Sequence, residues 1–214
     1  IVAPYKFTPD SRTWNHPDSG VLFCSCRWKD IEPLQGTYDW RCLEEKLDAA
    51  AALGCTCIVR ISPYALSAQE DIPAWLRMRY PEEPEFPFWR IDPNTTEYPR
   101  LWAALIRNFA ARYDGDPRIT SVDMAIVGAW GEGGGTENME ENAMKTVIAA
   151  YMEGFPHTPL TALLHDPKSL ACIRAFPKQV GFRVDCLGDM GGFHGDRWSH
   201  MLDFYPENIQ NFQM

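Results

Sequence analysis

A single glutamate, Glu132, lies in the segment IVGAWGEGGG (126–135), between a hydrophobic run and a series of glycines. The run has the composition of a buried strand and ends at Trp130. Glycine has no side chain, so the carboxylate has open space on both sides. A poorly solvated carboxyl group beside an apolar wall can serve as a general acid or base near neutral pH. The alternative is a structural glutamate that accepts hydrogen bonds from loop amides.

Ionisable or aromatic residues also stand at the ends of the other hydrophobic runs. Arg60 needs a carboxylate partner if it is buried, and Glu132 and Asp185 are both candidates. Asp185 has a second possible role, as a hydrogen-bond acceptor for a substrate hydroxyl. The residues at the five run ends are Trp28, Arg60, Trp130 with Glu132, His165 with Asp166, and Asp185 with Asp189.

These side chains depend on an alternation of strands and helices. The alternation predicts parallel strands joined by crossover helices, and the nearly continuous apolar strands indicate burial on both faces. A G-x-G-x-x-G fingerprint after the first strand is absent, which favours an α/β fold of the (β/α)8 TIM-barrel type over a doubly wound sheet. In such a barrel the carboxyl ends of the strands form the active site. We expect strands at 20–28, 55–64, 119–130, 158–165 and 180–189, a further strand near 1–7, helices at 38–54, 98–115, 141–155 and 167–177, and a long loop at 64–96.

The charge and the hydropathy of the chain disfavour a nucleic-acid partner and a membrane span. The net charge of −9 and the pI of about 5.0 are the opposite of a nucleic-acid-binding surface. No apolar run approaches the roughly 20 residues that cross a bilayer. We therefore expect no nucleic-acid partner and no membrane span.

The seven cysteines are interpreted as small core residues. Cys24 and Cys26, and likewise Cys55 and Cys57, are two residues apart inside apolar runs, so each pair faces one side of a strand. Structural zinc sites favour C-x-x-C spacing with further ligands, and this spacing is C-x-C. His165 and His194 could bind a metal with Asp189, but nothing in the sequence brings them together. We expect neither a metal nor a cofactor.

Four segments resemble the β-galactosidase-like, clan A glycoside hydrolase barrels. RWKDIEPLQGTYDW (27–40) is similar to their W-x-x-[IL]-E-P-x-x-G-x-Y-D-W segment, and IPAWL (72–76) to the P-x-W-L that follows. ARYDGDPRITSVDMAIVGAWGEGG (111–134) and GFRVDCLGD (181–189) resemble a poorly characterised subset with R-Y-D-G-D-P-R-I followed by W-G-E. The resemblance covers roughly residues 20–190, and the long R-Y-D-G-D-P-R-I…W-G-E motif is its most specific part.

The resemblance implies roles for particular residues. In clan A the acid/base glutamate ends the fourth strand, which matches Glu132, and the nucleophilic glutamate ends the seventh. We count about six strands by Asp189, so we expect a single barrel domain over 1–214 that is truncated at its C-terminal end, with the nucleophile beyond Met214. The clan has asparagine before its acid/base, where this chain has Gly131, and this departure bears on whether hydrolysis is retained.

The resemblance also implies a carbohydrate ligand. Trp28, Trp75 and Trp130, like Trp89, could stack on sugar faces or could pack in the core. His165 joins the candidate substrate-binding residues, whereas Glu32 is interpreted as structural. The expected function is hydrolysis of a β-linked carbohydrate. The alternatives are a non-catalytic carbohydrate-binding barrel and a scaffold domain of a larger cell-surface protein. A start at Ile1 without methionine fits a removed signal peptide, and a secreted or cell-surface location is favoured over the cytoplasm.

Overall fold

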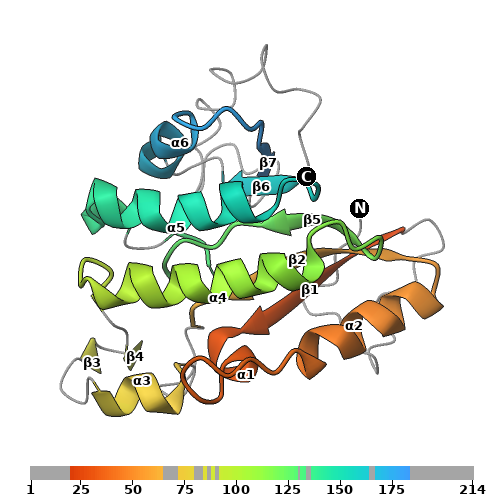
Figure 1. Ribbon diagram of the computed structural model, residues 1–214, viewed down its shortest axis with the longest axis horizontal. Coiled ribbons are helices and arrows are strands. Elements are labelled where there is room, and N and C mark those ends of the chain that lie inside the picture. The colour runs from red at the N-terminus through yellow and green to blue at the C-terminus, as the bar shows by residue number, and fades with distance from the viewer. Residues whose placement is uncertain are drawn as a thin grey trace, which may run out of the picture.

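Within the described part of the chain, the larger sheet has five parallel strands in the order β1-β2-β5-β6-β7 (Figure 1). The computed structural model describes residues 20–64, 72–79, 84–85, 88–89, 92–129, 131–133, 136–163 and 167–183. The strands are β1 (Val21–Arg27), β2 (Thr56–Ser62), β5 (Ile119–Asp123), β6 (Leu160–Leu163) and β7 (Gly181–Arg183). Every pair of neighbouring strands is parallel, which confirms the expectation from the sequence. The expected strand near 1–7 lies outside the described residues.

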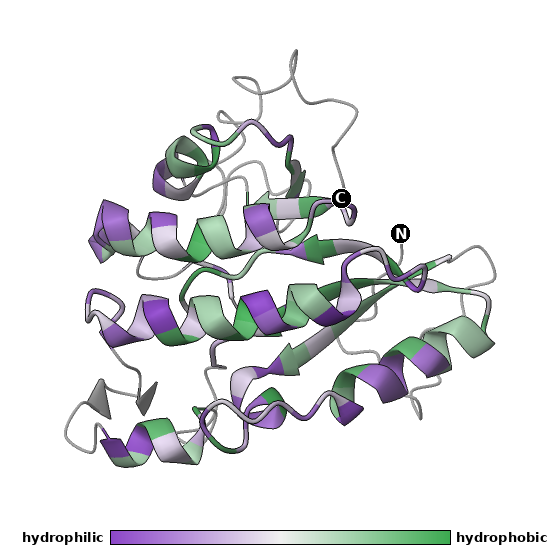
Figure 2. Cartoon of the chain, viewed as in Figure 1, coloured by the Kyte–Doolittle hydropathy of each residue, from purple (hydrophilic) through white to green (hydrophobic). Residues whose placement is uncertain are grey.

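Helices follow the strands in the expected places. They are α2 (Arg41–Ala52), α4 (Glu97–Tyr113), α5 (Glu141–Gly154) and α6 (Pro167–Ile173). In α4, Leu101, Leu105 and Phe109 recur at helical spacing and are buried in the core. Figure 2 shows the resulting alternation of hydrophobic and hydrophilic stripes along α2, α4 and α5. Leu53, which continues the periodicity of α2, instead caps that helix and is exposed.

Three parts of the chain differ from the sequence expectation. The region expected to be a loop at 64–96 contains α3 (Ala74–Arg79) and an antiparallel pair, β3 (Pro84–Glu85) with β4 (Phe88–Trp89). A short helix, α1 (Trp28–Ile31), follows β1 directly. Strand β5 ends at Asp123, although the hydrophobic run continues beyond it. Contacts between distant parts of the chain decide these boundaries, and those at the end of β5 are described below.

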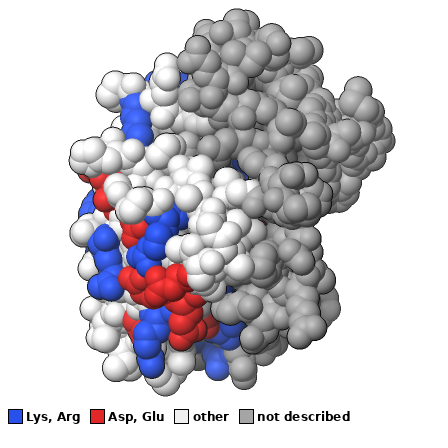
Figure 3. Space-filling model, turned by 90° about the vertical axis from the view of Figure 1, so that its right-hand side faces the viewer, with Lys and Arg blue, Asp and Glu red and all other residues white. Residues whose placement is uncertain are grey.

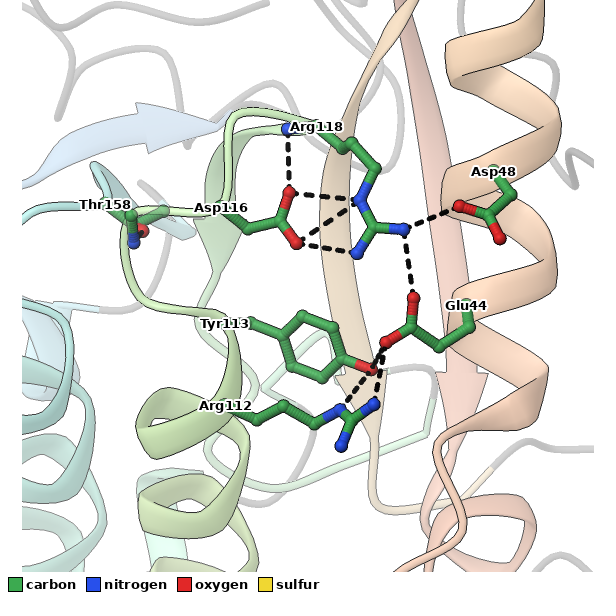
Figure 4. A network of polar contacts seen from close by, with 8 residues as sticks. Glu44, Asp48, Arg112, Tyr113, Asp116, Arg118 and Thr158 are labelled. Atoms are coloured by element: carbon green, nitrogen blue, oxygen red, sulfur yellow. Dashed lines mark hydrogen bonds and ion pairs between the residues drawn. The ribbon is translucent and has the colours of Figure 1, made fainter.

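The most specific sequence motif, RYDGDPRI, forms the turn from α4 into β5. Arg118 donates to Asp116 within this turn, and to Glu44 and Asp48 on α2 (Figure 4). Asp114 accepts hydrogen bonds from the backbone amides of His157 and Thr158, near the start of β6. Figure 3 shows acidic and basic side chains side by side on this face of the molecule. The motif therefore ties together the amino-terminal ends of the strands, the end of a parallel barrel that governs stability.

The four strand cysteines occupy the core, as the C-x-C spacing predicted. Cys24, Cys26, Cys55 and Cys57 are buried, and none of the four is in a disulfide bond. Among the described residues, no group of three or more metal-ligating side chains is assembled. No helix within the described ranges is long and apolar enough to span a membrane.

Thiol titration of denatured, unreduced protein is expected to count at least four thiols, because none of the four strand cysteines forms a disulfide bond in this structure. Titration with an aromatic disulfide reagent in denaturant measures the number directly. A count below four would show that these cysteines are already cross-linked.

Candidate active site

Three glycines with positive φ form the turn that presents Glu132. Gly128, Gly131 and Gly133 have φ angles of 97°, 77° and 77°, a region that residues with a side chain rarely adopt. The backbone amide of Glu132 donates to the carbonyl of Ala129 at 3.0 Å, and the amides on either side also donate to backbone carbonyls. These three amides are therefore committed to the turn itself. The conformation of this turn explains the glycines at positions 128, 131 and 133.

Gly131 is also required by close packing. A Cβ atom at this position would lie 2.5 Å from the Cβ of Ala125 and 3.3 Å from the Cδ of Arg60. No side chain fits there without moving the turn. The position at which the resemblance implied asparagine therefore has no room for one in this structure.

Substituting Gly131 by alanine is expected to destabilise the protein by about 2–5 kcal/mol, because the left-handed backbone costs about 1–2 kcal/mol and the overpacking about 1–3 kcal/mol more. Gly36→Ala is the matched control. Gly36 has a φ of 75° but nothing within 4 Å of the added Cβ, so only the backbone cost applies. Urea unfolding of both variants measures the difference, and equal losses of stability would contradict the packing argument.

A buried cluster of charged side chains lies next to this turn. Asp123, at the end of β5, is fully buried and accepts from Nε and Nη2 of Arg60 at 2.8 and 2.6 Å. Nε of Arg183, on β7, lies 2.9 Å from the same oxygen, Oδ2. One aspartate therefore joins three strands of the sheet, because β2, β5 and β7 each contribute a charged residue. The low dielectric of the interior strengthens these interactions, and it makes the loss of any one charge costly.

Arg60 also connects this cluster to Glu132. Its Nη1 lies 3.7 Å from Oε1 of Glu132, whose side chain is 33% exposed, whereas that of Arg60 is only 6% exposed. Glu132 is one of the two partners expected for Arg60 from the sequence, and the structure brings the two together. Asp123, which was not among the expected partners, accepts the two short hydrogen bonds from Arg60. An aspartate inside an apolar strand was the available signal, because a buried carboxylate needs a cation.

Aromatic side chains hold the chain where β5 ends. The carbonyl oxygen of Ala125 accepts from Nε1 of Trp102 at 2.8 Å and from the hydroxyl of Tyr151 at 3.2 Å. The hydroxyl of Tyr98 donates to the carbonyl of Ile126 at 2.8 Å. These side chains take the place of a neighbouring strand, so the buried backbone stays hydrogen-bonded after leaving the sheet. The glycine turn and Glu132 are thereby fixed to the rigid core.

Trp28 and Trp75 lie at the carboxyl end of β1, in contact with each other. Trp28 is fully buried, meets Trp75 edge-on at 6.1 Å, and donates to Oε2 of Glu32 at 2.6 Å. Of the two roles expected for Trp28, sugar stacking and core packing, the structure shows core packing. Neither face of its ring is open to a sugar. Trp75 is partly buried and donates to the carbonyl of Glu32. Burial raises the pKa of Glu32, which also accepts from the amide of Gly36, as expected of a structural residue.

The remaining candidates lie outside the described residues. These are Trp130, His165 and Asp185, together with Asp189 and His194; the side chain of Trp89 is likewise not described. A small pocket does border the glycine turn. Gly131 and Gly133 line it together with Met124, Leu163 and Ser169, so it lies between the end of β5, β6 and α6.

Half of the chain matches a known protein family. The family model Glyco_hydro_42, described as β-galactosidase, matches residues 19–125, which is half of the 214-residue chain. The chain belongs to this β-galactosidase family. The family match includes Arg60 and Asp123 and ends before Glu132. No curated protein matches the sequence.

Solved structures support the same fold for this family member. Endoglycoceramidase II from a Rhodococcus species, in a complex with a cellobiose-like imidazole, has a TM-score of 0.52 and 15% identity; 88% of this chain and 54% of that one are covered. Its lactosyl-enzyme intermediate gives 0.51 and 14%, with 90% and 53% covered. The chain thus spans about half the length of these structures. Their likeness shows the fold, an α/β barrel of the glycoside hydrolase type, with five consecutive strands within the described residues.

Proposed function

We propose that this protein hydrolyses a β-linked carbohydrate, with Glu132 as the general acid/base. The position of the Glu132 side chain is the main support for this proposal. Its carboxylate is one-third exposed, follows the carboxyl end of a central parallel strand, and lies 3.7 Å from the buried guanidinium of Arg60. The carboxyl ends of the strands are where barrel enzymes of this class place their chemistry. Membership of the β-galactosidase family supports the reaction class.

The acid/base role assigns a proton transfer to Glu132. As an acid, its carboxyl group would give a proton to the glycosidic oxygen as the bond to the leaving group breaks. The carboxylate that remains is negative, and the guanidinium of Arg60 lies beside it. Asp123 neutralises Arg60 from the other side through Nε and Nη2. Arg60 is therefore held by the core and does not depend on Glu132 for its position.

Hydrolysis also needs a second carboxylate. It would lie roughly 5–5.5 Å from Glu132 in a retaining enzyme, and roughly 6.5–9.5 Å away in an inverting enzyme. Asp123 does not fill this role, because it is fully buried and bound to two arginines. We propose that the second carboxylate comes from a later strand of the barrel. Asp185, which follows β7, is the candidate within this sequence.

A carbohydrate-binding barrel without hydrolytic activity is the second candidate. Gly131 favours it, because the residue before the acid/base cannot contribute a side chain to the sugar in this structure.

The test uses the full-length protein with a panel of aryl β-glycosides and β-linked oligosaccharides. Release of the aryl alcohol or of reducing ends measures hydrolysis, and calorimetric titration with the same oligosaccharides measures binding. Hydrolysis of any β-linked member supports the enzyme. Binding without hydrolysis supports the second candidate, and neither activity across the panel would reject both.

A further inference from the structure

Two pairs of cysteine thiols are in contact in this structure, and they differ in their surroundings. Sγ of Cys26 on β1 lies 3.1 Å from Sγ of Cys42 on α2. Sγ of Cys24 on β1 lies 2.8 Å from Sγ of Cys57 on β2. A disulfide bond is about 2.05 Å long, so roughly 1 Å of movement separates the Cys26–Cys42 pair from a bond.

Access to solvent distinguishes the outer pair, Cys26 with Cys42, from the inner pair, Cys24 with Cys57. Cys42 is partly exposed on α2, whereas Cys26 is 2% exposed. Cys24 and Cys57 are both fully buried between strands and the core. A reagent from solution can therefore reach the sulfur of Cys42 first. It cannot reach the inner pair without opening of the sheet.

The charge around the outer pair favours a thiolate at Cys42. Hydrogen bonding from Cys26 and the nearby ammonium of Lys46 lower the pKa of Cys42 to about 7, against the opposing effects of burial, Asp30 and Glu45. The same hydrogen bond, together with burial, raises the pKa of Cys26. Nζ of Lys46 lies 3.9 Å from the Sγ of Cys26. In the inner pair, hydrogen bonding from Cys24 also lowers the pKa of Cys57, but that thiol is shielded from solvent.

We propose that Cys26 and Cys42 form an oxidisable dithiol, which a small disulfide such as oxidised glutathione converts into a disulfide joining β1 to α2. The thiolate of Cys42 attacks one sulfur of the reagent, forming a mixed disulfide and releasing one glutathione thiolate. Cys26 then loses its proton to solvent, and its sulfur attacks that of Cys42, releasing the second glutathione thiolate. Two protein thiols are oxidised, and one glutathione disulfide is reduced to two thiols.

This inference does not depend on glycoside hydrolysis. It adds a second state to the reduced one described above, and Cys24 and Cys57 would remain thiols in that state. The bond would connect the strand that leads into α1 with the helix that covers it. The cross-link would therefore form on the side of the sheet that α2 covers.

The experiment incubates the reduced full-length protein with oxidised glutathione, alkylates the remaining thiols, and maps the peptides by mass spectrometry. Wild type should yield a Cys26–Cys42 disulfide with no lasting glutathione adduct. Cys26→Ala should instead accumulate a glutathione adduct on Cys42, because the second step is lost. Cys42→Ala should leave Cys26 reduced.

Cys24→Ala is the matched control, and it should form the Cys26–Cys42 disulfide as wild type does. Circular dichroism melting of each variant verifies that it is folded, and Cys26→Ser replaces Cys26→Ala if the alanine variant is not. The proposal is overturned if Cys42 stays reduced in wild type. It is equally overturned if the adduct on Cys42 persists there as it does in the Cys26 variant, or if Cys24 and Cys57 are linked instead.

Discussion

Glu132→Gln is expected to lower kcat for hydrolysis of a β-glycoside by about 10²–10⁴-fold, the usual contribution of a positioned general acid or base. Glutamine keeps the size and polarity of the side chain but cannot donate the proton. The loss should be larger for substrates whose leaving group is more basic, because those depend most on protonation. Initial rates for a series of aryl glycosides with leaving groups of different pKa measure this dependence directly.

Glu153→Gln is the control for this prediction. Glu153 is exposed on α5, so the same chemical change there should leave kcat unaltered. Equal activity of wild type and Glu132→Gln would remove Glu132 from catalysis. A uniform loss across all leaving groups would point instead to a structural effect of the substitution.

Asp123→Ala is expected to lower the free energy of unfolding by about 3–5 kcal/mol, because it leaves two buried guanidiniums without their shared partner. Arg60 would lose both of its hydrogen bonds to Asp123, and Arg183 its contact with Oδ2. The loss is a large share of the 5–15 kcal/mol that typically stabilises a domain. Urea unfolding followed by circular dichroism measures the change.

Asp48→Ala is the comparison variant. It also removes an aspartate that is paired with an arginine, but at an exposed position. Asp48 lies 2.7 Å from Nη1 of Arg118, but its side chain is 73% exposed. Its removal should cost no more than about 1 kcal/mol, as for most surface ion pairs. Asp123→Asn retains an acceptor oxygen without the charge and should fall between the two. If Asp123→Ala were as mild as Asp48→Ala, the buried cluster would not stabilise the fold.

The candidate site was accessible from sequence only in part. Glu132 could be selected because its glycine neighbours and the preceding hydrophobic run are local features of the chain. Arg60 could be selected because a buried arginine needs a carboxylate. Which carboxylate it meets depends on how two strands align. Strand β2 shifts register against β5 between Cys57 and Ile58, and the pairing then aligns Val59 with Val122. The next residues along, Arg60 and Asp123, consequently lie side by side.

By itself, then, the sequence determined the parallel α/β architecture, because the hydrophobic periodicity of strands and helices is local and repeats along the chain. It also determined that Glu132 follows a buried strand. Only the tertiary structure decided that β5 ends at Asp123, where side chains of Tyr98, Trp102 and Tyr151 donate hydrogen bonds to the carbonyl groups that follow the strand. It likewise placed the RYDGDPRI motif at the amino-terminal edge of the sheet and buried Trp28 in the core. These outcomes depend on contacts between residues far apart in sequence, which no local pattern encodes.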